Sequence, residues 1–527
     1  MNAVAPALDR LSPVVVYHVV NTLGWPSLRP LQEQAVPPVL DGSDALLLAP
    51  TAGGKTEAAV FPLLTAMESG RWPALSVIYV CPLKALLNNL EPRLAQYTGW
   101  LGRRTAVWHG DTTASERQKI LREPPDILLT TPESLEAMLI SLKVEHGRFF
   151  SHPRAIVIDE IHAFAGDDRG WHLLAVLERL TRLTGRPLQR IGLSATVGNP
   201  AQLLAWLQGS GRGTRPSAVV APDLPAPDLP ASDLPCDAGP AEPPGAALAA
   251  PPPGDIELDY VGSVSNAATV IAALHRGEKR LVFCDSRTLV EELGAKLRER
   301  GITTFLSHAS LSAAERRRSE LAFAEARDCV VVATSTLELG IDVGDLDRVI
   351  QINSPSTVAA FLQRLGRTGR RPGTTRNALF LALNHDELLW AAGLLHLWGT
   401  GYVEPVVPPS EPRHIVAQQL LALCLQEHRL GSNLWVEAWN GLAPFDRSAE
   451  PILRHLIDQG FLDVDGDLLF IGPGAEQRFG HRHFSGMTAV FTAPPQFTVF
   501  AGREEIGRTD PMLLTEKVEG PRLLLLA

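Results

Sequence analysis

An apolar segment leads directly into a loop of small residues and then into a second apolar segment, in the run ALLLAPTAGGKTEAAVF at residues 45–61. This pattern predicts a strand, a phosphate-binding loop and a helix, the order found in parallel α/β domains. Small residues let backbone N–H groups close around phosphates at the helix N-terminus. A glycine-rich turn arising by chance is the alternative, although the flanking segments favour the phosphate loop. The residues expected to hold a nucleotide are Thr51, Ala52, Gly53, Gly54, Lys55 and Thr56, with Lys55 on the β- and γ-phosphates and the Thr56 hydroxyl on Mg²⁺.

Two parts of the chain alternate short β-branched or leucine-rich runs with longer helical stretches, the βαβ pattern of a parallel sheet covered by helices. Between them, the tandem pentapeptides APDLP-APDLP-ASDLP cannot bury enough apolar surface to fold alone. Later in the chain, helices precede FLDVDGDLLFIG, two short strands around an Asp-Gly turn, which is typical of a winged helix. We therefore predict an α/β domain at 1–208, a Pro-rich linker at 209–254, a second α/β domain at 255–400, a winged helix at 401–475 and a β-rich segment at 476–527.

The charge balance excludes a chain that coats polyanions by bulk attraction. Lys and Arg number 48 against 58 Asp and Glu, which gives a net charge of −10, so any nucleic-acid surface must be local. The five cysteines form no C-x-x-C pair, which argues against a disulfide framework or a zinc cluster. No apolar run approaches the ~18 residues of a membrane-spanning helix, and the N-terminus lacks the pattern of a signal peptide. We expect a cytoplasmic protein without membrane contact.

A further apolar segment ends in two adjacent acids, in AIVIDEIH at residues 155–162. Parallel strands present their carboxyl ends to the ligand crevice, so Asp159 and Glu160 are expected to face the phosphate loop. Asp159 is the predicted Mg²⁺ ligand, and Glu160 is the predicted base that polarises the attacking water. Taken alone, such a pair is more often a solvated strand end, but the phosphate loop upstream reverses that preference.

A basic segment near the end of the second α/β part, FLQRLGRTGRR at residues 361–371, carries Gln363, Arg367 and Arg370 at spacings of four and three. On a helix, these three side chains share one face. Planar guanidinium groups make bidentate phosphate contacts, so a pair arriving from another domain would act as arginine fingers on ATP. A solvated basic helix end or a nonspecific phosphate patch is the alternative.

With these three signals in order, the chain resembles the superfamily 2 nucleic-acid helicases, which bind ATP between two tandem RecA-like domains. The resemblance includes RPLQ, similar to the Q motif, and segments similar to motifs I to VI, in the family's order. It implies ATP contacts from Arg29 and Gln32, with Gln32 at the adenine, and from Gly340 and Asp342 in the second domain. It assigns Lys84, Thr131, Ser286, Arg287 and Thr334 to the nucleic-acid backbone, and His162, Ser194 and Thr196 to coupling between the ATP site and strand movement.

Within the superfamily, DEIHAFAGDDRGWHL and LELGIDVGDLDRVIQINSPSTVAAFLQRLGRTGR, together with the expected winged helix, resemble the large helicase-related (Lhr) group. The resemblance implies ATP-dependent movement, 3′ to 5′, on single-stranded DNA, and unwinding of duplexes or RNA–DNA hybrids in DNA repair. It also implies Mg²⁺ with ATP as substrate, and a β-barrel that begins near residue 476 and is short or incomplete here. We expect the protein to be a monomer.

Two other functions remain open from the sequence. An RNA helicase or RNP remodeller would use the same motor motifs, because these contact the backbone and discriminate poorly between sugars. A nucleotide-gated nucleic-acid-binding module would use ATP only to switch affinity, although such a switch would not need Glu160, Arg367 and Arg370 together. The winged helix is expected either to read a duplex junction or to brace the two motor domains.

Overall fold

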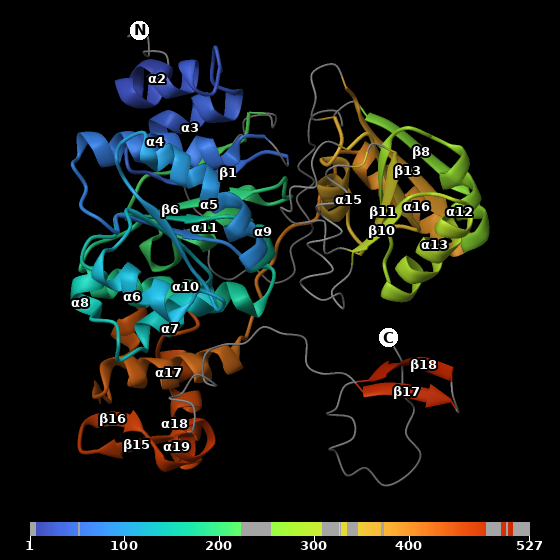
Figure 1. Ribbon diagram of the computed structural model, residues 1–527. Helices are drawn as coiled ribbons and strands as arrows, with labels where there is room; N and C mark the ends of the chain where they lie inside the picture. The colour runs from blue at the N-terminus through green and yellow to red at the C-terminus, as the bar shows by residue number, and fades with distance from the viewer. Residues whose placement is uncertain are drawn as a thin grey trace.

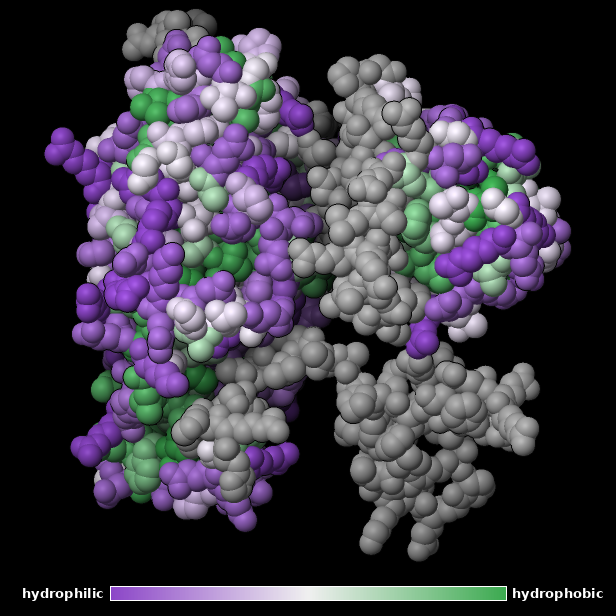
Figure 2. All heavy atoms as spheres, in the orientation of Figure 1, coloured by the Kyte–Doolittle hydropathy of each residue, from purple (hydrophilic) through white to green (hydrophobic). Residues whose placement is uncertain are grey.

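Two parallel sheets, each covered by helices on both faces, form the two largest parts of the molecule (Figure 1). The computed structural model describes residues 7–50, 53–222, 254–307, 326, 328–334, 346–369, 374–480, 497–501 and 504–509, the last two ranges by their backbone alone. Figure 2 shows that the outward surface of both parts is mostly hydrophilic. This is the tandem RecA-like α/β architecture that the sequence predicts.

The first sheet has seven parallel strands, whose central members are buried along their whole length because helices cover both faces. Side chains of one strand alternate between two hydrophobic cores, with Ala45 and Leu47 in one and Leu46 and Leu48 in the other. In spatial order the strands are β3 (Thr105–Trp108), β4 (Ile127–Thr130), β2 (Val77–Val80), β5 (Ala155–Ile158), β6 (Gln189–Ser194), β1 (Asp44–Leu48) and β7 (Ser217–Val220).

Eight helices bury their apolar sides against this first sheet. One face is covered by α2 (Pro13–Asn21), α3 (Pro30–Leu40), α4 (Lys55–Ser69) and α5 (Lys84–Gly99), and the other by α7 (Pro132–Leu139), α9 (His162–Ala165), α10 (Asp168–Thr184) and α11 (Pro200–Gln208). The other elements of this domain are α1 (Ala7–Arg10), α6 (Ala114–Arg122), α8 (His146–Phe149) and the 3₁₀ turn η1 (Gly209–Gly211).

The second sheet has six parallel strands and repeats the same layered arrangement. Its spatial order is β10 (Thr304–Ser307), β11 (Cys329–Ala333), β9 (Lys279–Phe283), β12 (Arg348–Ile352), β13 (Arg376–Ala382) and β8 (Gly254–Tyr260). One face packs on α15 (Val358–Leu365) and α16 (His385–Gly399), and the other on α12 (Val264–Ala273) and α13 (Arg287–Glu299).

Two strands refine the predicted limits of the linker. Strand β7 lies at residues 217–220, inside the range that the sequence assigned to the linker, and pairs in parallel with β1. Strand β8 begins at Gly254 and pairs in parallel with β13. The first sheet therefore extends past residue 208. The sequence assigned β7 to the linker because this strand is short and is followed at once by the Pro-rich repeats. The repeats themselves lie outside the described residues.

The part after the second sheet combines helices with a small antiparallel sheet, as expected for a winged helix. It contains α17 (Arg413–Glu427), α18 (Glu450–Asp458), α19 (Pro473–Phe479), the 3₁₀ turns η3 (Trp435–Trp439) and η4 (Arg447–Ala449), and the strands β14 (Leu430–Gly431), β16 (Leu468–Ile471) and β15 (Leu462–Asp465) in that spatial order. Its core includes the fully buried Trp435 and Trp439 and is continuous with Leu174 and Ala175 of α10. The winged helix therefore shares a hydrophobic core with the first domain.

The β-rich segment is represented by one antiparallel pair, β17 (Phe497–Ala501) and β18 (Glu504–Thr509). The other strands expected there lie outside the described residues. In the part of the chain that the structure describes, none of the helices has the length and apolarity needed to cross a membrane.

Candidate nucleotide site and the joints around it

The phosphate loop ends at Gly54, where α4 begins with Lys55. Gly54 has a φ of +79°, a conformation that glycine adopts without strain, and a Cβ there would lie 2.5 Å from Nε2 of Gln32. Lys55 is only 9% exposed, and its ammonium donates to the backbone oxygens of Ala49 at 2.8 Å and Pro50 at 3.3 Å. These bonds place the lysine within its own loop, at the point where phosphates are expected. Thr51 and Ala52 lie outside the described residues.

The two Q-motif residues lie directly behind this loop. The backbone N–H of Arg29 donates to Oε1 of Gln32 at 3.0 Å, and Nε2 of Gln32 approaches the backbone oxygen of Gly54 at 3.4 Å. Gln32 is 1% exposed, so its amide is fixed against the loop. The structure thus brings Gln32 to the nucleotide site, while its contact with adenine stays a prediction.

The acidic pair follows β5, as predicted. The Tyr79 hydroxyl donates to Oδ2 of Asp159 at 2.9 Å, and the backbone N–H of Glu160 donates to Oδ1 at 3.0 Å. Burial and the adjacent Glu160 raise the pKa of Asp159 to about 6, against the opposing charge of Lys55. Glu160 has a φ of +49°, an unfavourable conformation for a residue with a side chain. Such strain at an acid next to a phosphate loop supports a functional role for Glu160.

Two residues that the sequence did not single out, Tyr79 and Arg93, also face this site. The Arg93 guanidinium on α5 donates to Oγ1 of Thr56 at 2.8 Å and lies 3.5 Å from the carboxylate of Glu57. Burial and the charge of Asp159 raise the pKa of Tyr79, which keeps its hydroxyl a donor. Tyr79 sits within the apolar strand VIYV and Arg93 on an ordinary amphipathic helix, so neither had a distinguishing sequence signal.

The donor set suits Mg²⁺. Mg²⁺ usually binds through one or two protein ligands plus substrate phosphates and water, rather than a full protein cage. The Thr56 hydroxyl and the Asp159 carboxylate supply such oxygen ligands, and the described residues contain no group of three or more His, Cys, Asp or Glu arranged for a metal. When bound, Mg²⁺ would neutralise charge on the β- and γ-phosphates.

The predicted coupling residues form a chain of hydrogen bonds between the two α/β domains. His162 contacts Oγ of Ser194 through Nδ1 at 3.0 Å, and Nε2 of Gln363, from the second domain, through its own Nε2 at 2.9 Å. Burial lowers the pKa of His162 to about 4, so the ring is neutral at pH 7. Since the Gln363 amide donates to Nε2, the Nδ1–H donates to Ser194. Nε2 also lies 3.6 Å from Glu160, whereas Thr196 lies just beyond β6 and is partly buried.

The basic segment differs from the helix that we expected. Helix α15 ends at Leu365 with Gly366 as its C-cap, and Gly369 adopts a φ of +67°, so Gln363 is helical but Arg367 follows the helix end. The expectation that Gln363, Arg367 and Arg370 share one helical face is therefore wrong, because the glycines end the helix. Arg367 is 1% exposed. Arg370, Gly340 and Asp342 lie outside the described residues.

The residues predicted to contact nucleic acid all follow the carboxyl ends of parallel strands, where α/β sheets bind their ligands. The Thr131 hydroxyl accepts the N–H of Ser134 at the start of α7, and the Ser286 hydroxyl accepts the N–H of Leu289 at the start of α13. The half-exposed Lys84 pairs with Asp111 at 2.8 Å. Arg287 begins α13, and Thr334 follows β11. Their contact with nucleic acid stays a prediction.

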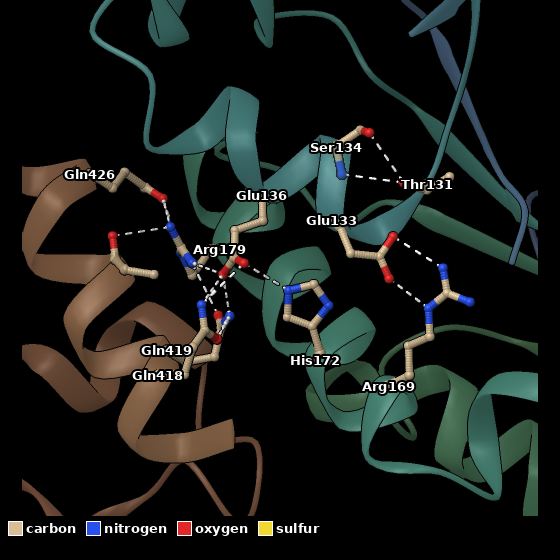
Figure 3. Close-up of polar contacts among 11 residues, drawn as sticks. Thr131, Glu133, Ser134, Glu136, Arg169, His172, Arg179, Gln418, Gln419 and Gln426 are labelled. Atoms are coloured by element: carbon tan, nitrogen blue, oxygen red, sulfur yellow. Dashed lines mark hydrogen bonds and ion pairs between the residues drawn. The ribbon is translucent and has the colours of Figure 1, made fainter. Parts of the chain in front are cut away.

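The helix behind Thr131 also carries the joint with the winged helix (Figure 3). Glu136 of α7 accepts hydrogen bonds from Nε2 of His172 at 2.9 Å and from Gln418 at 3.1 Å, and it also pairs with Arg179. Arg179 in turn donates to Gln426 of α17 at 2.7 Å. The side chains of Glu136, His172 and Arg179 are 0% exposed. This buried network docks the winged helix on the first domain, and the winged helix's role, reading a duplex junction or bracing the motor domains, stays a prediction.

Comparison with known proteins agrees with the order of the motifs. Residues 29–204 match the DEAD/DEAH box helicase family, and residues 265–372 match the helicase conserved C-terminal domain. The chain is 30% identical over 475 residues to the Lhr helicase/probable uracil glycosylase of Mycolicibacterium smegmatis, covering 80% of this chain and 30% of that protein. It is 28% identical over 478 residues to the ATP-dependent helicase Lhr-Core of Methanocaldococcus jannaschii, covering 86% of this chain and 52% of that protein. The chain thus spans about half or less of each relative.

Solved structures agree at the level of the fold. The helicase Lhr of Mycobacterium smegmatis, solved with ssDNA and AMP-PNP, matches with a TM-score of 0.75 and 29% identity, over 94% of this chain and 64% of that chain. The DUF1998 helicase MrfA bound to DNA matches with a TM-score of 0.69 and 21% identity, over 93% and 66%. The fold and the site define a superfamily 2 helicase, built on tandem RecA-like ATPase domains. Within that class, the chain belongs to the Lhr family.

Proposed function

We propose that this chain is an ATP-driven motor that moves 3′ to 5′ on single-stranded DNA and unwinds duplexes or RNA–DNA hybrids in DNA repair. One observation carries the motor function: the Ser194–His162–Gln363 chain of hydrogen bonds joins the nucleotide site of one domain to the helix α15 of the other. The choice of single-stranded DNA is supported by the ligands in the structure of the Mycobacterium smegmatis relative. Direction, hybrid preference and repair rest on family resemblance.

In this proposal, ATP would bind with its phosphates at Lys55 and Thr56, and Thr56 and Asp159 would hold Mg²⁺. Glu160 takes a proton from the attacking water, which lies on the γ-phosphate side of the site. Arg367 and Arg370 stabilise the charge on the transferred phosphoryl group from the second domain. Because Gln363 donates to His162, which lies 3.6 Å from Glu160, a change at the nucleotide would be transmitted to α15 of the second domain.

The DNA track would follow the carboxyl edge of both sheets. Lys84 and Thr131 lie there in the first domain, and Ser286, Arg287 and Thr334 lie there in the second. Such contacts are mainly to phosphates, and in a protein with a net charge of −10 they would have to form a local surface. Closure of the domains on ATP would then shorten the distance between the two sets of contacts and advance the strand.

One chain supplies both sides of the nucleotide site, so we propose that the working unit is a monomer. We also propose a cytoplasmic location. The four cysteines in the described part of the chain are all buried and free, as is usual in reducing compartments.

The experiment is steady-state ATP hydrolysis with Mg²⁺, without nucleic acid and then with single-stranded DNA or RNA of matched length. Strong stimulation by DNA, followed by unwinding of a 3′-tailed but not a 5′-tailed duplex, is the expected result. Stimulation by RNA alone would instead indicate an RNA helicase or remodeller. Binding of ATP and DNA without stimulated hydrolysis would indicate a nucleotide-gated binding module.

A further inference from the structure

Between α16 and the winged helix, the chain crosses the first domain as an extended segment at residues 403–409, called the strap below (Figure 1, orange). Its backbone is fixed to the first domain at successive points. The Asn199 side chain exchanges two hydrogen bonds with the backbone of Val406, at 2.9 and 2.8 Å. The indole N–H of Trp171 donates to the backbone oxygen of Pro409 at 2.7 Å. The strap is therefore a built contact rather than a loose linker.

The strap also lies against the loop that follows the coupling residues Ser194 and Thr196. The backbone N–H of Gly198 donates to the backbone oxygen of Glu404 at 3.2 Å. A Cβ at Gly198 would lie 2.1 Å from the backbone oxygen of Val403, a distance that no side chain tolerates. Glycine is thus required at this position by the close approach of the strap.

Glu404 of the strap also contacts the second domain through its side chain. The Glu404 carboxylate accepts the backbone N–H of Val358 at 2.8 Å and of Ala359 at 3.0 Å, in the first turn of α15. The Thr357 hydroxyl accepts the N–H of Ala360 at 3.1 Å, so three N–H groups of this turn are satisfied. A carboxylate at a helix N-terminus also interacts favourably with the helix dipole. Glu404 therefore fixes the position of the helix that carries Gln363.

We propose that Glu404 is a positioning residue for ATP hydrolysis: its backbone is tied to the loop after motif III, and its carboxylate holds the motif VI helix. In the described structure α15 already holds Gln363 at His162, and hydrolysis also needs the arginines that follow α15 at the nucleotide. Glu404 sets where α15 stands relative to the first domain when the domains close on ATP. The inference rests on the proposed function, since the closure concerned is closure on ATP.

Replacing Glu404 tests the proposal through a split between kinetic constants. In E404A, two first-turn N–H groups lose their partner, and we expect kcat for ATP hydrolysis to fall about five- to tenfold with the ATP KM within about twofold. E404Q keeps one acceptor oxygen and should lie between wild type and E404A. Gly198→Ala displaces the strap from the other side and should show the same split. Small-angle scattering should show that AMP-PNP with Mg²⁺ contracts E404A less than wild type.

The matched control is Glu411→Ala, because Glu411 is exposed and pairs only with the exposed Arg413 among the contacts seen for it. E411A should retain wild-type kcat and contraction. If E404A and E404Q match E411A in kcat and in contraction, the proposal is wrong, even if their thermal midpoint falls. A wild-type chain that DNA does not stimulate would overturn the proposed function alone, because the variants would still be compared by their basal hydrolysis and contraction.

Discussion

The first α/β domain makes two joints of opposite kind. Toward the winged helix, it shares a hydrophobic core and the buried network of Glu136, His172 and Arg179. Toward the second α/β domain, the described contacts are the His162–Gln363 hydrogen bond and the strap at Glu404. From this comparison we expect the winged helix to move with the first domain and the second domain to move relative to both.

The physical difference lies in what each joint costs to open. Separating Arg179 from Glu136 and the glutamines would leave charged groups without partners in a low-dielectric interior. Separating the two α/β domains exposes polar groups that can form hydrogen bonds with water or ATP instead, because the nucleotide site is lined for a polar ligand. A motor needs both properties: one interface between domains that stays closed, and one that opens and closes as the nucleotide binds and is hydrolysed.

The largest expected effect is on ATP hydrolysis, at the nucleotide site alone. Glu160→Gln removes the proposed base, and we expect kcat for ATP hydrolysis to fall by about 10²–10⁴ while ATP and DNA binding persist. The thermal midpoint should not change, because the winged-helix joint is intact. Steady-state kinetics and equilibrium binding measure both, with the exposed Glu145→Gln as control. Normal hydrolysis by the Glu160 variant would refute this role.

A loss of comparable size in stability should follow from breaking the other joint. Arg179→Ala leaves Glu136 buried without its guanidinium partner, and we expect the free energy of unfolding to fall by about 3–5 kcal/mol in urea titrations. Arg182→Ala is the matched control on the same helix, since Arg182 pairs with Glu437 at the surface and should cost about 1 kcal/mol or less. Equal losses in the two variants would show that the buried network does not hold the joint.

Acid should weaken the two joints in different pH windows. Burial lowers the pKa of His162 to about 4, so its contribution is complete above its unfolded pKa near 6.5 and is lost as pH falls toward 4. The pKa of Glu136 is lowered to about 2, against its burial, by His172 and Arg179, so its contribution is lost only below pH 4.5. Between pH 7 and pH 5, we expect wild type to lose about 2 kcal/mol more than His162→Asn, because the unfolded histidine gains a proton that the buried ring does not. Urea unfolding of both proteins at pH 7 and 5 measures this; identical losses would contradict it.

The smallest expected effect comes from the hydrogen bond between His162 and Gln363, which joins the two α/β domains. Gln363→Ala removes the donor to His162, which is a contact of about 1 kcal/mol, and we expect kcat to fall about fivefold with a loss of stability of about 1 kcal/mol or less. Steady-state kinetics and thermal unfolding on one preparation measure both. A loss of stability as large as that of Arg179→Ala would mean that the two joints are alike.

The sequence was sufficient to predict those parts of the fold and site that depend on residues close together in the chain. The phosphate loop with Lys55 and the acids after β5 lie where the motifs placed them, because strand, turn and helix are set by neighbouring residues. The helix over residues 361–370 was wrong because Gly366 ends it early. The strand order of the sheets and the early start of β8 depend on pairing between distant segments.

The buried network was beyond the reach of sequence reasoning for a related reason. Glu136 and Arg179 read as ordinary charges on surface helices, and their burial arises only when α17 packs against them from more than 200 residues away. The role of Glu404 likewise could not be predicted, because it depends on contacts with Gly198 and α15, which are distant in the sequence. The positions of the phosphate loop and of the acids after β5 were therefore predictable, and the contacts that join the domains were not.

The most direct test of the two-joint account is a pair of distance measurements by spin labels on a chain whose Cys236 is replaced. One pair, at Ser115→Cys and Asp465→Cys, spans the first domain and the winged helix, and the other, at Ser115→Cys and Ala295→Cys, spans the two α/β domains. All three positions are exposed. On adding AMP-PNP, Mg²⁺ and single-stranded DNA, the account predicts that the first distance stays constant and the second changes. A first distance that changes as much as the second would contradict it.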